Sequence, residues 1–543
     1  MSPVDPRAAT FGLEGHVVVM DDAFRRLERG VVYVNAGTIV DVVPTDAPPP
    51  AGLEQAPVVN TGGTIYPGLI DLHNHLSYDA LPLWNVPQRF DNRDRWSGGS
   101  MQETYRKNIS GPMTVLGRTP GLIEAVVRYV EAKCLLSGVT TSQGIALFSN
   151  QGAQRFYQGL VRNVETSKIE GMPPAVTRIA DVEAGDVTAF LHRLNSSTCL
   201  LLHLSEGTDA ASRGHFESLQ IGPDEWAITA ALAGIHCVAL EGEDFEVMAE
   251  RGASMVWSPL SNLLLYGATA KVDEAKDAGV TIGLGADWSP SGSKNLLGEL
   301  KAARAFDAER EVFSDRELVA TATRDAARIL RWDAALGTFE AGKRADLLVL
   351  TGREGDPYER LLTAKETSVR LVVIDGIPRC GAVELMGEFD LGPATERWSV
   401  GDSERLLNLR DESAEPLIES LTLETAAERL DEAMRRLPEL AKELESLEGV
   451  LAPAGAAEPT WMLLLDHEEP MGLDQRPHLP GADGKPTAEL TLDLAAASIL
   501  LSELLVSIEL DAATVSDDPG FVDRLVSQMN LPPEVAEALP ALY

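Results

Sequence analysis

Short apolar runs that resemble β-strands alternate with helical stretches over residues 63–335, and this alternation constrains the fold more than any other feature. The strand-like runs include GLIDLH, GVTTSQGIAL, CLLLHL, GIHCVAL, ASMVWSP and VTIGLGAD, and the helical stretches include 121–136, 224–233, 272–278 and 315–331. Repeated strand–helix units are typical of parallel α/β proteins. This many units in about 270 residues favour a (β/α)8 TIM-like barrel over an open sheet.

Strand-like segments also occur on both sides of this region. Residues 1–62 contain HVVVM and GVVYVNAGTIVDVVP, in which the Asn35-Ala-Gly37 turn predicts a hairpin. Residues 336–388 contain GTFEAGKRADLLVL and VRLVVIDGIPRCG. Each segment is too small to enclose a core alone. We therefore predict that 1–62 and 336–388 join into one small β-sandwich domain beside the barrel at 63–335.

Residues 389–543 differ in character from the rest of the chain. Residues 424–448 show helical periodicity with a charged outer face, and 489–509 are a more apolar helix or helix pair. We predict an acidic, mainly helical C-terminal extension. An appendage that covers apolar surface is the first interpretation of its role. A dimer contact, a partner-binding module and an active-site lid are the alternatives.

The net charge of the chain is −37, and more than half of this excess lies after residue 400. Such a surface repels phosphate, which excludes nucleic acid and anionic membranes as expected partners. The chain has no run of eighteen apolar residues and no basic start followed by an apolar stretch, so neither a membrane span nor a signal peptide is expected. Four cysteines, Cys134, Cys199, Cys237 and Cys380, lie far apart and are typical of isolated core thiols in a reducing compartment. A cytoplasmic location is the expectation.

Polar residues with metal-binding or acid–base chemistry lie at or near the ends of four strand-like runs. His73 and His75 close the first run, and a strand would point both imidazoles the same way, about 6 to 7 Å apart. The later positions are His203, followed by Glu206, then His236, and finally Asp287. Taken singly, His236 is equally a hydrogen-bonded core histidine, Asp287 a helix cap and Glu206 a solvated acid. Their joint occurrence where a barrel would place its active site indicates a metal-dependent enzyme.

The order His-x-His, His-x-x-Glu, His, Asp, with PGLIDLHNH before it and GKRADLLVL and VVIDG after it, resembles the amidohydrolase superfamily over residues 10–385. More narrowly, it resembles the branch of the cytosine, guanine and S-adenosylhomocysteine deaminases and the triazine hydrolases. The resemblance implies one divalent metal, with zinc the first expectation and iron the alternative, bound by His73, His75, His203 and Asp287. Three imidazoles, a carboxylate and an open position suit a metal that activates water. The resemblance also makes a homodimer an expectation.

The resemblance further implies roles for the acid–base residues. Glu206 matches a proton shuttle that takes a proton from the activated water and delivers it to the leaving nitrogen. His236 matches a histidine that orients the water or polarises the reacting group, and Asp287 also accepts a proton from the nucleophile.

Lysines and the remaining histidines give no sign of a second metal. Lys133 lies in the predicted helix 121–136 and Lys168 in a polar loop, so no lysine ends a predicted barrel strand and one metal is favoured over two. We predict surface or loop positions for His16, His192 and His215, and a solvated acidic turn around His467.

Substrate contacts are expected from the loops that follow the strands. SYDALPLWNVPQRFDNRDRW, after the first run, is rich in tryptophan and arginine, which stack on planar rings and bind anionic groups bidentately. Packing of the loop and pairing with Asp91 and Asp94 are the alternative reading. The residues we predict to touch substrate are Trp84, Arg93, Asn262 and Trp288.

The prediction from these residues is a metal-dependent hydrolase acting on carbon–nitrogen bonds other than peptide bonds. Deamination of a small nitrogen heterocycle by metal-activated water is favoured, because Glu206 and His236 resemble the deaminase pair. Hydrolysis of a cyclic amide or of a carbon–chlorine bond on the same metal centre is the alternative. A non-catalytic binding protein on the barrel scaffold is the alternative of a different class, and Glu206 argues against it because a binding scaffold needs no proton shuttle.

Overall fold

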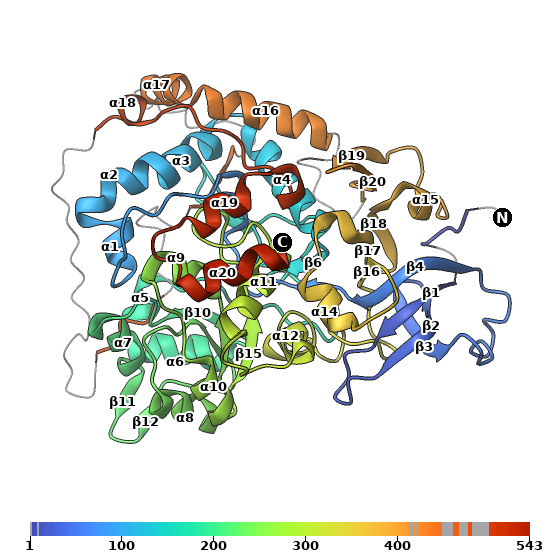
Figure 1. Cartoon of the computed structure of the whole chain (residues 1–543). Coiled ribbons are helices and arrows are strands. Elements are labelled where there is room, and N and C mark those ends of the chain that lie inside the picture. The colour runs from blue at the N-terminus through green and yellow to red at the C-terminus, as the bar shows by residue number, and fades with distance from the viewer. Residues whose placement is uncertain are drawn as a thin grey trace.

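The computed structural model describes residues 3–7, 10–411, 418, 421–447, 460–465, 476–480 and 499–543 (Figure 1). Short parallel strands lie at its centre. One sheet has the order β10 (Leu200–Leu204), β13 (Leu232–His236), β14 (Ser254–Trp257) and β15 (Thr281–Leu284), and a second has the order β5 (Leu69–Ile70), β6 (Val139–Ser142) and β9 (Arg162–Asn163). These strands are buried along nearly their whole length, as strands covered on both faces must be.

Backbone hydrogen bonds join the two parallel sheets at both edges. On one side Leu72 N donates to Leu284 O at 3.2 Å, and Asn74 pairs with Asp287 in a parallel bridge. On the other side, residues 175–177 lie between β9 and β10, because Ala175 N donates to the carbonyl of residue 164 at 2.8 Å and residue 176 pairs with Leu200. The strands therefore follow one another in a closed, barrel-like ring.

Helices follow most strands of the ring. They include α4 (Leu122–Leu136), α6 (Val187–Ser196), α7 (Ala210–Glu217), α8 (Gly242–Glu250), α9 (Pro259–Tyr266), α10 (Val272–Ala278), α11 (Leu296–Asp307), α12 (Asp315–Thr321) and α13 (Arg324–Leu330). Helices predicted at 121–136, 272–278 and 315–331 are confirmed by α4, by α10 and by α12 with α13. The helix predicted at 224–233 is wrong. Its first residues form β12 (Glu225–Trp226), which turns back on β11 (Gln220–Gly222) through Pro223, a residue that favours turns over helix interiors.

The two chain ends outside the ring meet in one sheet of nine strands. Its order is β19 (Glu396–Val400), β20 (Ser403–Leu407), β18 (Ile377–Ala382), β17 (Val369–Ile374), β16 (Leu347–Thr351), β4 (Val58–Pro67), β1 (Phe11–Val18), β2 (Arg26–Asn35) and β3 (Thr38–Pro44). β4 pairs with β1 and β16, which joins the N-terminal strands to those after the ring. The predicted sandwich is thus a single sheet, and β19 and β20 extend it beyond residue 388 by pairing with the otherwise open edge of β18.

The described residues after 420 lie against the ring (Figure 1). α16 (Leu423–Arg435) packs along α4, α17 (Leu437–Leu447) lies beside α3 (Gly111–Arg118), and α20 (Pro533–Leu542) packs on α11. β21 (Trp461–Leu463) adds to β7 (Ala146–Ser149). Of the predicted apolar helix 489–509, residues 489–498 lie outside the described part, and only α18 (Leu501–Leu504) is helical in the remainder.

Three of the minor predictions can be compared with burial. All four cysteines are buried and unpaired, as predicted. His16 and His215 are buried rather than at the surface: His16 lies on β1, between β2 and β4, and its ring is 3.0 Å from Arg353 O, while His215 lies on the inner side of α7 beside His478. His192 is exposed as predicted, and His467 lies outside the described residues. No helix in the described part of the chain is long and apolar enough to cross a membrane.

Arg128, on α4, ties the ring to the chain that follows the sheet. Its guanidinium is buried and donates to the carbonyls of Leu409, Ile418 and Leu421 at 2.9–3.0 Å. Arg128→Met should lower the free energy of unfolding by about 3 kcal/mol, because it leaves buried carbonyls without donors. Urea denaturation checks this, with Arg435→Met on the exposed face of α16 as the control. Equal stability of the two variants would contradict the prediction.

Candidate metal centre

His73, His75 and Asp287 are brought together by the backbone pairing that closes the ring. Asp287 N donates to His73 O at 2.8 Å, and His75 N donates to Asp287 O at 2.6 Å. The two imidazoles consequently lie on one side of Asp287, with Nε2 of His73 and of His75 at 3.2 and 3.5 Å from its Oδ1. The side chain of Asn74 points away from the two imidazoles, and its Nδ2 donates to Asp71 Oδ2.

β10 and β13 add His203 and His236 to the same group. The ring of His73 has its centre 4.7 Å from that of His203 and 5.2 Å from that of His236. Nitrogen and oxygen atoms within 4.8 Å of one another form two overlapping sets, His73 with His203 and His236, and His73 with His75 and Asp287. All five residues that the sequence singled out at strand ends therefore meet at one end of the ring.

Two of these residues have left-handed backbone conformations. φ is +70° at His236 and +66° at Asp287, where most side chains are disfavoured. His236 ends β13, whereas Asp287 follows the end of β15 by three residues, at its bridge to Asn74. The backbone turns at both residues, and both side chains face the group. Non-glycine residues in this conformation concentrate at functional sites, where the surrounding structure holds them.

The His203 and His236 imidazoles are buried and electrically neutral, whereas the Asp287 carboxylate is ionised. Burial, with the neighbouring imidazoles and Arg93, lowers the pKa of His203 well below its usual value, and burial lowers the pKa of His236 to about 4. Burial alone would raise the pKa of Asp287, but His73 and the other histidines lower it. Neutral imidazoles and an ionised carboxylate are the forms that bind a metal.

The donor atoms fit a divalent metal. Among the described residues, both ring nitrogens of His203 and Nε2 of His73 have no hydrogen-bond partner, although each is buried. Buried polar atoms normally have partners, so several imidazole nitrogens without one, gathered within 4.8 Å of one another, are typical of a metal site. Imidazole and carboxylate ligands suit zinc and iron alike.

Gln143 and Asn262 orient two of the rings. His73 Nδ1 donates to Gln143 Oε1 at 3.3 Å, which leaves Nε2 free to bind a metal. Asn262, which we predicted to touch substrate, donates through its amide nitrogen to His236 Nδ1 at 3.0 Å and accepts from Thr269. His236 must then carry its proton on Nε2, the nitrogen 3.8 Å from Glu206 Oε2. A protonated nitrogen cannot bind a metal, which favours His203 over His236 as the third imidazole ligand.

Glu206 is held from three sides. Tyr266 OH donates to its Oε1 at 2.7 Å, Arg93 Nη1 lies 3.4 Å from its Oε2, and His236 faces the same oxygen. Trp96 Nε1 donates to Tyr266 OH at 2.9 Å. Burial would raise the pKa of Glu206, but His236, Arg93 and the Tyr266 hydrogen bond lower it, so the carboxylate is ionised.

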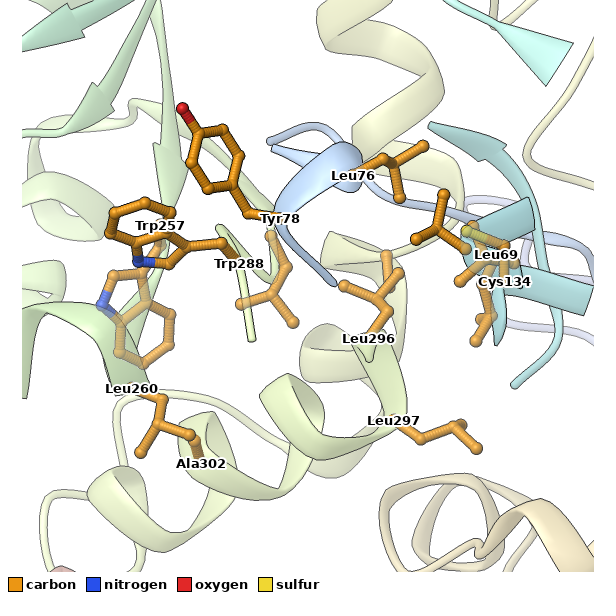
Figure 2. Packing of buried hydrophobic residues seen from close by; sticks show 14 of the residues in the cluster. Leu69, Leu76, Tyr78, Cys134, Trp257, Leu260, Trp288, Leu296, Leu297 and Ala302 are labelled. Carbon is orange, nitrogen blue, oxygen red and sulfur yellow. The ribbon is translucent and has the colours of Figure 1, made fainter. Parts of the chain in front are cut away.

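Aromatic side chains cover the group on the side of His75. The ring of Trp288 lies 5.8 Å from His75, 5.3 Å from Tyr78 and 5.6 Å from Trp96, and Figure 2 shows Tyr78 and Trp288 next to each other. Trp84, the fourth predicted contact, packs elsewhere and stacks on Phe90. Arg93 and Trp288 therefore lie at the metal centre, Asn262 lies behind His236, and Trp84 is part of the packing of its loop.

A cavity of about 20 Å³ lies beside His75 and is lined by Gln143, Glu165, Thr177, Arg178 and Leu464. Glu165 accepts hydrogen bonds from Gly144 N and Thr177, and burial raises its pKa to about 7. The cavity holds about one water molecule, so a ring-sized ligand must displace side chains. A larger cavity of about 740 Å³ lies between β9 and turns of the nine-stranded sheet and is not lined by any of these imidazoles.

The sequence analysis missed several residues of this site. Gln143 lies within the run GVTTSQGIAL, directly after the last residue of β6, but a neutral amide is outside the metal-binding and acid–base residue types that selected the histidines. Tyr266 and Trp96 gave no such signal, because a helix and a loop carry them to Glu206. Lys133 and Lys168 lie on α4 and in an exposed loop, so neither contributes to the metal centre.

Comparison with known proteins identifies the family to which the chain is similar. The model of the amidohydrolase family matches residues 64–377, more than half of the chain. A 5-methylthioadenosine/S-adenosylhomocysteine deaminase of Symbiobacterium thermophilum is 24% identical over 67% of this chain and 89% of its own length. The corresponding deaminase of Syntrophobacter fumaroxidans is 25% identical over 68% of this chain and 92% of its own length.

Among solved structures, a variant of the atrazine chlorohydrolase of Arthrobacter aurescens TC1, complexed with zinc and atraton, superposes with a TM-score of 0.52 at 20% identity. The match covers 68% of this chain and 94% of that one. At this identity the likeness concerns the fold, a TIM-barrel-like α/β structure with a sheet-rich domain.

Replacement of a buried imidazole tests the metal centre. His203→Asn should lower metal affinity by more than about 100-fold, because it removes one imidazole from the group of donors. Elemental analysis of purified protein and titration with a chelator measure this. His192→Asn, on the exposed side of α6, is the matched control and should keep the metal content of the unmodified protein. A fully loaded His203→Asn protein would remove His203 from the ligand set.

Proposed function

The chain belongs to the amidohydrolase family, and on this premise we propose that it is a zinc-dependent hydrolase that deaminates a small nitrogen heterocycle. The observation that carries the proposal is the position of Glu206. An ionised carboxylate, held by Tyr266 and Arg93, faces a histidine that carries its proton toward it, beside a group of donors that fits a metal. A site that only binds a ligand has no need of this pairing.

His73, His75, His203 and Asp287 would hold the metal. When bound, the metal supplies Lewis-acid activation of the attacking water. Asn262 keeps His236 protonated on Nε2, and this nitrogen can donate to the ring or to the oxygen that develops on it. Gln143 keeps His73 in the tautomer that binds.

Glu206 moves the protons. Its carboxylate accepts a proton from the attacking water as the carbon–oxygen bond forms, and then delivers that proton to the amino nitrogen as the carbon–nitrogen bond breaks. The products are ammonia and the hydroxy form of the ring, which becomes the oxo form when its hydroxyl proton moves to the adjacent ring nitrogen. Trp96, through Tyr266, fixes one carboxylate oxygen and so leaves Oε2 as the oxygen that exchanges the proton.

The substrate that the chemistry and the relatives support is an aminopurine-like ring. The similar proteins of known name are 5-methylthioadenosine/S-adenosylhomocysteine deaminases, whose substrates carry adenine. Trp288 offers a face on which a planar ring can stack beside His75. Glu165 lines the adjoining cavity and offers an acceptor for ring N–H groups, provided that the side chains around the cavity move apart.

Metal content and ammonia release test the proposal together. Purified protein should contain about one zinc per chain and release ammonia from an adenine nucleoside or a related ring. The screen should include purines, pyrimidines, pterins and triazines. Release of chloride but no ammonia from a chlorotriazine would show that the reaction is dechlorination and not deamination. Ring opening of a cyclic amide without deamination would show that the reaction is amide hydrolysis. Absence of metal from the purified protein would contradict the proposal of a metal-dependent hydrolase.

Glu206→Gln should lower kcat by about a thousandfold, because the amide cannot carry the proton. Metal content should stay at that of the unmodified protein, since Glu206 is not among the proposed ligands. Glu217→Gln on α7 is the control, with full activity expected. Retained turnover in Glu206→Gln would remove the proton-transfer role.

Tyr266→Phe should lower kcat by about tenfold and leave KM nearly unchanged, because it removes one hydrogen bond that positions Glu206. Steady-state kinetics with the substrate found above give both constants. Tyr33→Phe, on β2 of the nine-stranded sheet, is the matched control. An increase in KM alone would indicate that Tyr266 contacts substrate instead.

A further inference from the structure

Two buried lysines of the ring contact one carboxylate, and the C-terminal extension supplies that carboxylate. Lys133, on α4, has its Nζ 2.7 Å from Asp511 Oδ2, and Lys294, in the segment after Asp287, contacts Asp511 Oδ1. The three side chains are at most 3% exposed. Lysine and aspartate are almost never buried this completely unless they are paired.

This cluster touches the segments that carry two of the proposed metal ligands. Lys133 also donates to Asp79 O at 2.6 Å and to Ser289 Oγ at 3.3 Å. Asp79 follows His75 by four residues, and Ser289 follows Asp287 by two. Asp79 Oδ1 accepts from both Ser289 N, at 2.8 Å, and Ser289 Oγ, at 3.1 Å, so the two segments are joined directly.

The backbone around Asp511 is fixed at the same place. Asp511 N donates to Ala80 O at 3.0 Å, which extends the contact to the end of the segment after His75. Tyr129 OH, on α4, donates to Asp511 O at 2.6 Å, and Lys294 Nζ donates to Ala512 O at 3.2 Å. Residues 511 and 512 thus bind α4, the segment after His75 and the segment after Asp287 simultaneously.

The charges around the cluster require the Asp511 carboxylate. Burial alone would raise the pKa of Asp511, but Lys133 and Lys294 lower it, so the group is ionised. Asp79 also faces Lys133, with a pKa that burial raises to about 6, and Asp518 lies 3.5 Å from Lys294. Asp511 is the carboxylate that contacts both lysines, so its loss would leave the two buried ammonium groups without the charge that joins them, next to both ligand segments. An uncompensated buried charge is strongly destabilising.

We propose that Asp511 is a positioning residue of the metal centre. Its carboxylate, supplied by the C-terminal extension, holds together the segments that follow His75 and Asp287, so that the ligands reach their places only when the extension is docked. This inference rests on the proposed metal centre but not on the proposed reaction. It assigns the part of the extension around residue 511 to the active-site framework.

Asp511→Asn in the full-length chain tests this role, because the amide keeps the shape and removes the charge. In metal-free protein, hydrogen exchange at residues 76–80 and 288–294 should become at least about fivefold faster. After loading, zinc release to a chelator should become about tenfold faster. Glu509→Gln, two residues away and exposed, is the matched control and should change neither rate.

The results separate the inference from the proposed function. Exchange and zinc release at the rates of the unmodified protein would overturn the role of Asp511, whatever reaction the enzyme catalyses. Failure to find a substrate would leave both measurements unaffected. If Asp511→Asn does not fold, Tyr129→Phe loosens the same backbone by one hydrogen bond. It should then speed exchange at 76–80 and zinc release severalfold, and unchanged rates in that variant would equally overturn the proposal.

Discussion

The backbone pairing between residues 73–75 and Asp287 is the contact on which the site depends. Two hydrogen bonds, from Asp287 N to His73 O and from His75 N to Asp287 O, close the ring and set His73, His75 and Asp287 around one point. More than 200 residues separate the two strands, so their pairing also brings everything between them into the ring. β10 and β13 then bring His203 and His236 to the same edge, because parallel strands present their carboxyl ends together, and the left-handed backbone at His236 completes the placement.

The polar surroundings of this pairing serve to fix protonation states. Gln143 and Asn262 each make one hydrogen bond to an imidazole and thereby determine which nitrogen carries the proton. Tyr266 and Arg93 keep Glu206 ionised despite its burial. In a site closed to bulk water, these contacts have the strength that low dielectric surroundings give to charges and dipoles. The site is therefore prepared for proton transfer before any ligand enters.

Local rules predicted much of the site and of the fold. The polar residue that ends an apolar run is visible in one sequence, and it marked His73, His75, His203, His236 and Asp287 correctly as neighbours. Helical periodicity located α4 and α10, but it failed at residues 224–233, where Pro223 and a two-residue strand outweigh the pattern.

Contacts between distant segments could not be predicted in this way. Tyr266 reaches Glu206 from the end of a helix, and Asp511 reaches Lys133 across 378 positions. Nothing in the composition around either residue marks these contacts, because Tyr266 ends an apolar, buried helix and Asp511 lies in an acidic tail. The addition of β19 and β20 to the nine-stranded sheet is also a contact that local patterns do not predict. An open strand edge pairs with whichever segment the fold brings to it.

The position of Asp511 has a consequence for the order in which the protein can mature. His73 and His75 leave the ribosome early, whereas the carboxylate that secures their segment is synthesised more than 400 residues later. A growing chain contains all the proposed metal ligands by residue 287, and both lysines by residue 294, but it lacks the carboxylate that joins those lysines. If Asp511 has the proposed role, stable loading with metal must wait until the chain has grown past residue 511.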